Sequence, residues 1–518
     1  MKRNLFIIIF TLGILLRLFL VLRTDFPMNQ GGMFYVMVED LVANGFRLPL
    51  FTTYNFDGIP FAYSPLGFYL TGLMSVMLNL PILHLMKIIP FIFATGTVGV
   101  YYFFAKRILK SETAALIALF LYICSPNAHM SQLEAASITR APALFLALLT
   151  LIFVYDLYHD KSWKKIVGAA VALSGTALFH LETAVFVVYS IAVLYIIYSR
   201  TVMGAVRTVI LGIGALILSA PWWLSVVYNH GLDPFIAAQQ SRPWTIFGGL
   251  NLQQLSLLRH FANPLFDPFP SLAFFGIVVC IARRQWFLPL WFALLLATGL
   301  RLFLTTTGII TIAMMAAFAL HAALLPGLLK LLKPVEAYGA SFSAARVKFG
   351  FYMASALFVI GCFSTTFWHP FTPFQALSPA SRQSMEWVKD NTSKTDKFLI
   401  ITPVPHWAWF LDHISEWFPA LAKRSSILTA QGYEWRPGFT RRLEMLEHIK
   451  QCVHRDITCL EDKIQDVGVH YTHIYIAKPF ELEPNVAACC HILAESLAIA
   501  SGYTLVYNGE GALIYKKK

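Results

Sequence analysis

The sequence predicts a polytopic α-helical membrane domain followed by a water-soluble α/β domain. Of its 518 residues, 57% are hydrophobic and 13% are charged, and the mean hydropathy is +0.62. Soluble domains are about 25% charged, so most of this chain is expected to lie in lipid. Apolar runs of membrane-helix length recur up to about residue 366 and then stop. We therefore expect a membrane domain over residues 1–366 and a soluble domain over residues 367–518.

About eleven apolar runs are predicted to cross the membrane. The first follows Lys2 and Arg3 and has no small-residue cleavage site, so we interpret it as a retained helix rather than a signal peptide. The predicted spans are residues 4–22, 88–105, 113–126, 142–158, 166–181, 183–199, 208–225, 269–282, 285–300, 305–325 and 349–366.

One further apolar segment, IPFAYSPLGFYLTGLMSVMLNLP at residues 59–81, could be a twelfth span. If it does not cross and the N-terminus is cytoplasmic, 16 Lys and Arg side chains lie inside and seven outside. If it crosses, every basic cluster after residue 85 moves outside, against the positive-inside rule. Pro65 and Pro81 also suit a helix that lies in the membrane interface. We therefore predict a long outer loop over residues 23–87; the alternative is a true span offset by another that is miscounted.

This topology predicts an integral protein of the plasma membrane with a cytoplasmic N-terminus and an extracytoplasmic C-terminal domain. The net charge of +12 lies wholly in the first 366 residues, because the rest carries 16 basic and 16 acidic residues. A basic excess in membrane loops reflects insertion, and no basic stripe interleaves with aromatics on a soluble face. No nucleic-acid partner is therefore expected. The sequence has no Walker A loop, Rossmann fingerprint or nucleophile elbow, which argues against soluble nucleotide chemistry.

Carboxylates are concentrated on the predicted outer face. Acidic residues contribute little to orientation, so this surplus suggests a site for a metal, sugar hydroxyls or a general base. Solvated loop charge is the alternative for each residue taken singly. The outer carboxylates are Asp25, Glu39, Asp40, Asp57, Glu134, Glu182, Asp233 and Asp267.

Two further polar positions stand at predicted membrane boundaries. His180 and Glu182 interrupt an apolar run between two spans, where polar groups usually line a cavity or pair with one another. The alternative is a tight turn whose His meets water. Arg140 at the mouth of a span suits a phosphate or a carboxylate such as Glu134, although snorkelling to the interface would also explain it.

The first outer loop resembles that of the GT-C glycosyltransferases, which include protein O-mannosyltransferase-like enzymes and aminoarabinose transferases. The resemblance rests on GMFYVMVEDLVANGFRLPLFTTYNFDGIPFAYSPLGFYL, residues 32–70. In that family a helix, a G-x-x-x-P turn and a juxtamembrane P-P-L helix follow one another; here a helix, GFRLP and SPLGFYL do. The loop at 125–141 and a soluble domain after the last span are further similarities.

The resemblance implies a polyprenyl-phosphate sugar donor and an acceptor on the outer face, with a carboxylate that deprotonates the acceptor and a cation or Arg140 that steadies the phosphate. Where the family has an acidic pair, this chain has Asn29 and Gln30, and where it has a second-loop Asp, this chain has Arg140. Amides bind sugar hydroxyls but do not act as bases. Either Asp25, Glu39 or Asp40 replaces the pair, or catalysis by the family route is lost.

The first hypothesis is therefore a membrane glycosyltransferase that uses a polyprenyl-phosphate sugar. The alternative is a non-catalytic GT-C-like scaffold or lipid-binding subunit, and a transporter ranks third because inverted repeats are not evident. A divalent cation is a candidate cofactor, with no metal ligands assigned. The catalytic candidates are Asp25, Glu39, Asp40, Glu134 and Glu182, and the substrate-binding candidates are Asn29, Gln30, Tyr63, Arg140, His180, Glu416 and Trp417.

The tail is predicted to form a small α/β domain. We expect helices at 379–391, near 438–451 and near 485–499, strands in KFLIITPVP and THIYIAK, and a closing hairpin around Asn508-Gly509. The segment at 413–439, HISEWFPALAKRSSILTAQGYEWRPGF, could bind a sugar or a peptide acceptor; packing against the first loop is the slightly favoured alternative.

Cysteine is a weak signal in this chain. Cys124, Cys280 and Cys362 lie in predicted spans and should be inert, and no zinc spacing is evident. Cys452 and Cys459 are close enough in sequence to form a disulfide on an oxidising outer face, and Cys489 or Cys490 could pair with another partner.

Overall fold

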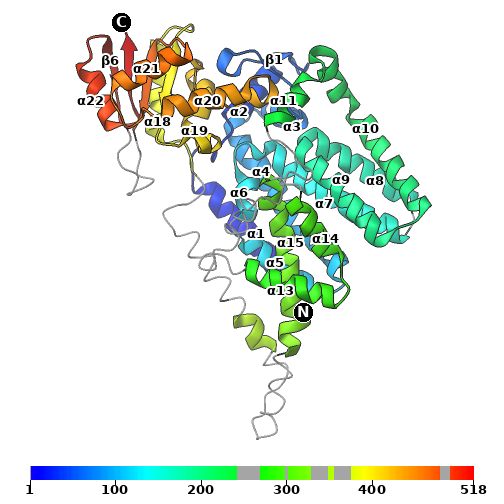
Figure 1. Ribbon diagram of the computed structural model, residues 1–518. Coiled ribbons are helices and arrows are strands. Elements are labelled where there is room, and N and C mark those ends of the chain that lie inside the picture. Colours follow the sequence, from blue (N-terminus) through cyan, green and yellow to red (C-terminus); the bar gives the residue numbers. More distant parts are fainter. Residues whose placement is uncertain are drawn as a thin grey trace.

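The computed structural model describes residues 2–125, 127–160, 162–241, 269–297, 301–327, 348–354, 357, 375–478 and 490–518. These residues form a helical bundle with a mixed-sheet domain at one end, and the N-terminus lies at the opposite end of the bundle (Figure 1). The expected domain boundary at 366/367 lies outside the described residues.

Six helices in the described ranges are long and apolar enough to cross a membrane, which confirms the polytopic helical fold. The number of spans stays a prediction, because four expected spans are shorter helices and the last one, 349–366, lies mostly outside the described residues. The six are α1 (Lys2–Leu22), α4 (Ile82–Leu109), α7 (Ser137–Asp160), α9 (Leu181–Tyr198), α10 (Val202–His230), and Ile310–Gly327, which covers the end of α15 (Arg301–Ala319) and η2 (Leu320–Leu324). The shorter ones are α5 (Glu112–Cys124), α8 (Trp163–Phe179), α13 (Phe269–Ala282) and α14 (Phe287–Ala297).

The first loop carries its own short elements. They are α2 (Gly32–Ala43), β1 (Phe51–Thr52), η1 (Tyr54–Phe56), β2 (Ile59–Pro60) and α3 (Leu66–Leu78). With 13 residues, α3 is about 20 Å long, whereas the hydrocarbon core of a bilayer is about 30 Å thick. A left-handed Asn79 ends α3 and Pro81 precedes α4, so the apolar stretch at 59–81 does not form one helix of membrane-crossing length.

The C-terminal domain is a five-stranded sheet flanked by helices, as predicted. Its strand order is β4-β3-β5-β7-β6, with β3 parallel to β4 and β5 and with β7 antiparallel to β5 and β6. The strands are β3 (Lys397–Ile401), β4 (Ser425–Ser426), β5 (His473–Ala477), β6 (Tyr503–Asn508) and β7 (Ala512–Lys517). The helices are α18 (Pro379–Asn391), η3 (His406–Leu411), α19 (His413–Ala422), η4 (Tyr433–Trp435), α20 (Phe439–Lys450), α21 (Ile457–Val467) and α22 (His491–Ile499).

The two faces of the sheet bury different partners because successive strand residues point to opposite sides. Leu399 and Ile401 pack with α20, α21 and α22. Phe398 and Ile400 pack into a core that also contains Trp417 and the first-loop residue Phe34. One face of the sheet and the first loop therefore share a single hydrophobic core.

Cysteine pairing agrees with the prediction where the structure describes it. Cys452 and Cys459 form a disulfide, and Cys490 is also disulfide-bonded. Cys124 and Cys280 are buried and free. Cys362 and Cys489 lie outside the described residues.

Arg424 joins the ends of two helices beneath the sheet. Its guanidinium donates to the carbonyl oxygens of Lys389 (2.7 Å), Thr392 (2.5 Å) and Lys423 (2.9 Å), and to the Thr392 hydroxyl (3.0 Å). These groups lie at the ends of α18 and α19, whose last carbonyls have no partner inside the helix. Arg424 is 4% exposed, so these bonds are shielded from water.

We expect Arg424→Met to lower the free energy of unfolding of the sheet domain by about 1–3 kcal/mol, because buried carbonyl groups lose their donor. The thermal midpoint of the purified full chain, followed by tryptophan fluorescence, measures this. The matched control is Arg455→Met, which changes an exposed arginine of the same domain. Equal midpoints for the two variants would contradict the role given to Arg424.

Candidate functional site

A cavity of about 430 Å³ lies where the first loop, the starts of α7 and α9, α11 (Asp233–Ser241) and the sheet domain meet. In Figure 1 the labels α2, α3 and α11 mark this end of the bundle, beside α20. Of the predicted site residues, the cavity is lined by Gln30, Tyr63, Arg140, His180, Glu182 and Glu416.

The segment Met28–Gln30 is held between two other segments by backbone hydrogen bonds. The backbone N–H groups of Ala135 and Ala136 donate to the carbonyls of Met28 (2.8 Å) and Gln30 (2.7 Å), and the N–H of Asn29 donates to Gln375 (2.6 Å). Asn29 has a left-handed backbone conformation with a φ of 55°. Its amide donates to Glu134 (3.1 Å), while Gln30 lines the cavity.

Arg140 brings a cation to the wall of the cavity. Its Nη1 donates to Glu134 Oε2 at 2.7 Å, and the two side chains are 15% and 14% exposed. Arginine carries five N–H donors, so this pair leaves donors for a ligand. In the described part of the chain, Arg140 Nε and Gln30 Nε2 are buried without a hydrogen-bond partner. Two donors are thus available beside the same cavity.

His180 forms the junction of α8 and α9, where it caps the second helix. Its Nδ1 accepts from the backbone N–H of Thr183 (3.2 Å), and the side chain is 4% exposed rather than solvated. The ring of Tyr63 lies with its centroid 6.1 Å from the His180 ring. Glu182 follows in the first turn of α9 and lines the cavity, so the α8–α9 turn delivers a carboxylate to it.

Glu416 connects the sheet domain to the first loop. Its carboxylate accepts the backbone N–H groups of Gly31 (3.0 Å), Gly32 (2.9 Å) and Met33 (3.0 Å), which lie at the start of α2. Burial raises the pKa of Glu416, and the three N–H donors act in the opposite direction. A helix N-terminus favours a carboxylate at this place. The direct contacts of this predicted substrate ligand are therefore structural, although it lines the cavity.

The glycines at the start of α2 allow this approach. A Cβ on Gly32 would lie 2.8 Å from the carbonyl oxygen of Glu416 and 2.9 Å from the Cα of Trp417. A Cβ on Gly31 would lie 2.3 Å from the Cβ of Ala135. Only glycine therefore fits at 31 and 32.

The other predicted site residues do not line the cavity and have structural contacts. Asp25 pairs with Arg382, and Glu39 pairs with Lys423. Asp40 accepts from the hydroxyls of Thr52 (2.7 Å) and Thr53 (2.6 Å) and from the backbone N–H of Thr53 (2.8 Å). Trp417 is buried and donates to the carbonyl of Asn29 (2.8 Å), and Glu134 holds Arg140. Through Glu416 and Trp417, segment 413–439 packs against the first loop. This is the interpretation that the sequence analysis slightly favoured.

Several cavity residues were not singled out by the sequence analysis. They come mostly from η3, the segment before α20, and α11. For those within segment 413–439, the signal was its density of Trp, Glu and Arg. The residues outside that segment had no signal in the sequence. Together, the residues inside and outside the segment are Phe235, Gln239, Ser241, Trp409, Phe410, Gln431, Glu434 and Trp435.

The described residues do not bring together three or more His, Cys, Asp or Glu side chains that could hold a metal ion. In the cavity, Glu416 is occupied by backbone donors, and Glu434 accepts the N–H of Gly432 (2.7 Å). The described side chains therefore do not fit a divalent cation.

We expect Glu416→Gln to lower the free energy of unfolding by about 1–3 kcal/mol, because the amide keeps one acceptor oxygen and turns its NH₂ toward a buried N–H. Tryptophan fluorescence, to which the adjacent Trp417 contributes, reports the thermal midpoint. Glu444→Gln, an exposed glutamate on α20, is the control. An unchanged midpoint in Glu416→Gln would show that the charged cap does not hold the two parts together.

Solved structures show which fold the chain has. No family model matches the sequence, and none of the curated proteins matches it. The archaeal oligosaccharyltransferase AglB from Archaeoglobus fulgidus, in complex with an inhibitory peptide and a dolichol-phosphate, is similar with a TM-score of 0.59 and 13% identity, over 92% of this chain and 70% of that one. ArnT from Cupriavidus metallidurans bound to undecaprenyl phosphate is similar with a TM-score of 0.54 and 13% identity, over 98% and 97%. The arabinofuranosyltransferase AftD from Mycobacteria has a TM-score of 0.57 and 12% identity, over 100% of this chain and 41% of that one. AglB, ArnT and AftD are GT-C glycosyltransferases, and the chain has the GT-C membrane fold.

Proposed function

We propose that the chain is a membrane glycosyltransferase that moves a sugar from a polyprenyl-phosphate donor to an acceptor on the outer face of the membrane. One observation carries the proposal: Arg140, with a buried Nε that has no hydrogen-bond partner among the described residues, and Glu182 line the same cavity at one end of the helical bundle. The polyprenyl phosphates bound by AglB and ArnT support the choice of donor.

The chemistry follows from the two charges. Glu182 takes the proton of an acceptor O–H, and the acceptor oxygen forms a bond to the anomeric carbon of the donor sugar. The bond between that carbon and the phosphate oxygen breaks, and the polyprenyl phosphate leaves with the electron pair. Arg140 stabilises the charge that develops on the phosphate, since a buried donor directed at a leaving group lowers the barrier.

The amides at 29 and 30 have separate roles in this proposal. Asn29 supports Glu134, which orients the Arg140 guanidinium. Gln30 presents its Nε2 to the cavity, where it can bind a sugar hydroxyl. The acidic pair of the family is thus replaced by one supporting and one binding amide, and the role of base passes to Glu182.

A non-catalytic scaffold or lipid-binding subunit is the second candidate. The observation that favours it is the occupation of the carboxylates near the first loop: Glu134 by Arg140, Glu39 by Lys423 and Asp25 by Arg382. A scaffold would bind the lipid phosphate through Arg140 without any transfer. Lipid binding without release of polyprenyl phosphate is its signature.

We expect Glu182→Gln to slow sugar transfer by about 100-fold or more, because the amide cannot take the acceptor proton. The full chain in lipid nanodiscs is incubated with undecaprenyl- and dolichol-phosphate hexoses and pentoses, and released polyprenyl phosphate is measured by mass spectrometry. Arg140→Lys should slow release by at least about tenfold, since lysine offers a point charge in place of the planar donor set.

The control for these measurements is Glu444→Gln, which lies on α20 away from the cavity and should behave as the original chain. Activity in Glu182→Gln together with its loss in Asp25→Asn, Glu39→Gln, Asp40→Asn or Glu134→Gln would move the base to that carboxylate. No release from any donor would favour the scaffold.

The outer-face placement predicts a labelling pattern. A membrane-impermeant maleimide applied to intact cells should modify Gln465→Cys in α21 and not Lys110→Cys between α4 and α5, both of which are exposed positions. Permeabilised cells should show both modified. Labelling of Lys110→Cys alone would reverse the orientation and place the cavity on the cytoplasmic side.

A further inference from the structure

The cavity has two chemically different walls. The wall from the membrane part carries Arg140, His180 and Glu182. The wall from the sheet domain carries the rings of Trp409, Phe410 and Trp435, with polar side chains from Gln431 and Glu434 between them. One cavity therefore joins a charged half to an aromatic half.

The aromatic rings of the cavity pack in two groups, and in one of them Trp409 meets Phe410 edge to face with centroids 6.1 Å apart. Trp435 meets Tyr63 edge to face with centroids 5.5 Å apart, and Phe235 of α11 meets it at 6.4 Å. Phe410 is 41% exposed although it lines the cavity. An aromatic ring that remains accessible beside amide and carboxylate groups suits a ligand with an apolar face and a hydroxylated edge.

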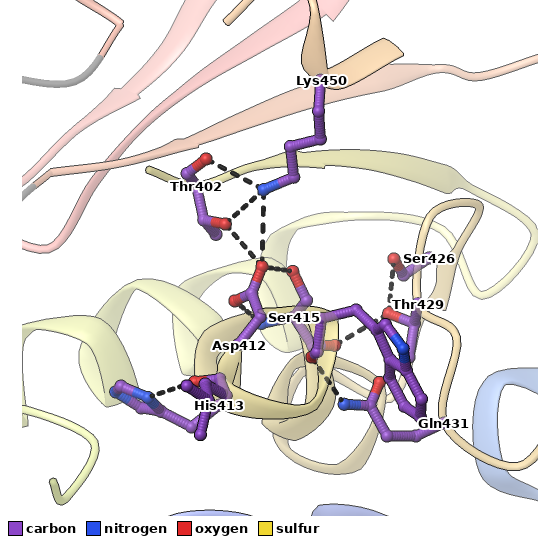
Figure 2. A network of polar contacts seen from close by, with 10 residues as sticks. Thr402, Asp412, His413, Ser415, Ser426, Thr429, Gln431 and Lys450 are labelled. Carbon is purple, nitrogen blue, oxygen red and sulfur yellow. Dashed lines mark hydrogen bonds and ion pairs between the residues drawn. The ribbon is translucent and has the colours of Figure 1, made fainter. Parts of the chain in front are cut away.

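A buried polar network fixes this wall from behind. Lys450 donates to the carbonyl (2.9 Å) and hydroxyl (2.6 Å) of Thr402 and lies 3.5 Å from Asp412, which also accepts from the Ser415 hydroxyl at 2.9 Å. Figure 2 shows these side chains pointing toward one another from separate elements. Lys450 and Asp412 are 7% and 6% exposed, so the pair is shielded from water and its geometry is specific.

The network continues to the cavity residues. Thr429 donates to the carbonyl of Ser415 (2.8 Å), and the amide of Gln431 donates to the carbonyl of Trp409 (3.3 Å), as Figure 2 also shows. Asp412 directly follows η3, which carries Trp409 and Phe410. The aromatic wall is thus held by an ion pair and by hydrogen bonds rather than by ring packing alone.

Negative charge prevails among the described residues of the aromatic half. Among the lining residues that the structure describes, Arg140 alone carries a guanidinium or ammonium group, and the sheet-domain wall contributes two carboxylates, Glu416 and Glu434. These carboxylates favour a neutral acceptor over a phosphate-bearing one at this wall. A peptide cannot add as a strand at the edge strand β4, because Asn55 already caps Ser426 of that strand on both its N–H (2.6 Å) and its carbonyl (2.9 Å).

The geometry points to a subsite for a neutral carbohydrate acceptor on the wall formed by Trp409, Phe410, Gln431, Glu434 and Trp435. The apolar face of the sugar ring stacks on the aromatic rings, and its hydroxyls bond to Gln431 and Glu434. This places an acceptor hydroxyl in the same cavity as Glu182 and the donor half. The inference rests on the proposed function for the direction of transfer, while the binding itself does not depend on turnover.

The test is saturation-transfer NMR on the full chain in nanodiscs without any donor. The probes are methyl glycosides of glucose, galactose, mannose, N-acetylglucosamine and arabinose, a neutral Gly-Ser-Thr-Asn peptide, and short-chain phosphatidylethanolamine. We expect at least one glycoside to bind saturably at millimolar concentration, with the strongest saturation on the C–H protons of one ring face.

Two variants and a control make the result specific. Trp435→Ala should weaken glycoside binding at least tenfold, and Phe410→Ala, a half-exposed side chain whose loss leaves the fold intact, should weaken it at least threefold. Trp387→Ala is the matched control, because this tryptophan packs on Tyr507 in the sheet domain away from the cavity. The Trp387→Ala variant should bind glycosides as tightly as the original chain.

Three results would overturn the inference. The first is no saturable glycoside binding up to 100 mM, and the second is binding of the peptide or the lipid in place of every glycoside. The third is that Trp435→Ala and Phe410→Ala bind glycosides as well as the control does. Glycoside binding without release of polyprenyl phosphate in the transfer assay would sink the proposed function and leave the carbohydrate subsite standing. Release of polyprenyl phosphate without glycoside binding would support the proposed function and overturn the carbohydrate subsite.

Discussion

The carboxylate of Glu416 at the start of α2 is the contact on which the architecture of the site depends. Three backbone N–H groups that a helix cannot satisfy internally receive their acceptor from a residue 383 to 385 positions later in the chain. Through this contact α19 lies against the first loop, and η3 and η4 come to face the starts of α7 and α9. The cavity exists because the two parts of the molecule are closed against each other at this point.

Around this contact, neighbouring polar side chains share hydrogen-bond partners. Glu134 is shared by Arg140 and Asn29, so the amide that stands where the family has an acid supports an ion pair. Tyr54 donates to the backbone carbonyl of Glu416 itself (2.6 Å), which adds a second bond between the first loop and α19. Buried polar groups of this kind are costly unless paired. The Asn29–Glu134 and Tyr54–Glu416 bonds join segments distant in sequence, whereas Glu134 and Arg140 are neighbours along the chain.

Elements that depend on local patterns were predictable from the sequence. The helix at 379–391 has the expected bounds because Pro379 follows the capping Ser378, and the closing hairpin and the two long strands follow from alternation and turn residues. The placement of residues 59–81 required an argument over the whole chain, since composition alone fits a span and the main argument against one was the distribution of Lys and Arg, with support from Pro65 and Pro81.

The site was predictable only in part, because it is made of long-range pairs. Arg140, His180 and Glu182 were found since polar groups at membrane boundaries are conspicuous. Asp25, Glu39 and Asp40 looked equivalent to them in sequence, yet a lysine, an arginine and two threonines from other segments are their partners. No local signal marks Glu416 as a helix cap or Trp435 as a cavity wall, because each role is defined by the residue it meets across the interface.

The close approach of the α19 backbone to Gly32 has a consequence for biosynthesis. The ribosome completes the first loop long before it makes α19, so the apolar side chains of the loop, Phe34 and Phe61 among them, wait without their cover while hundreds of residues are inserted. A methyl group at Gly32 would lie 2.8 and 2.9 Å from backbone atoms of α19, so it would obstruct the late arrival of this helix. A chain that fails to close there would remain in the membrane as a partly assembled intermediate with exposed apolar surface, which quality control would remove.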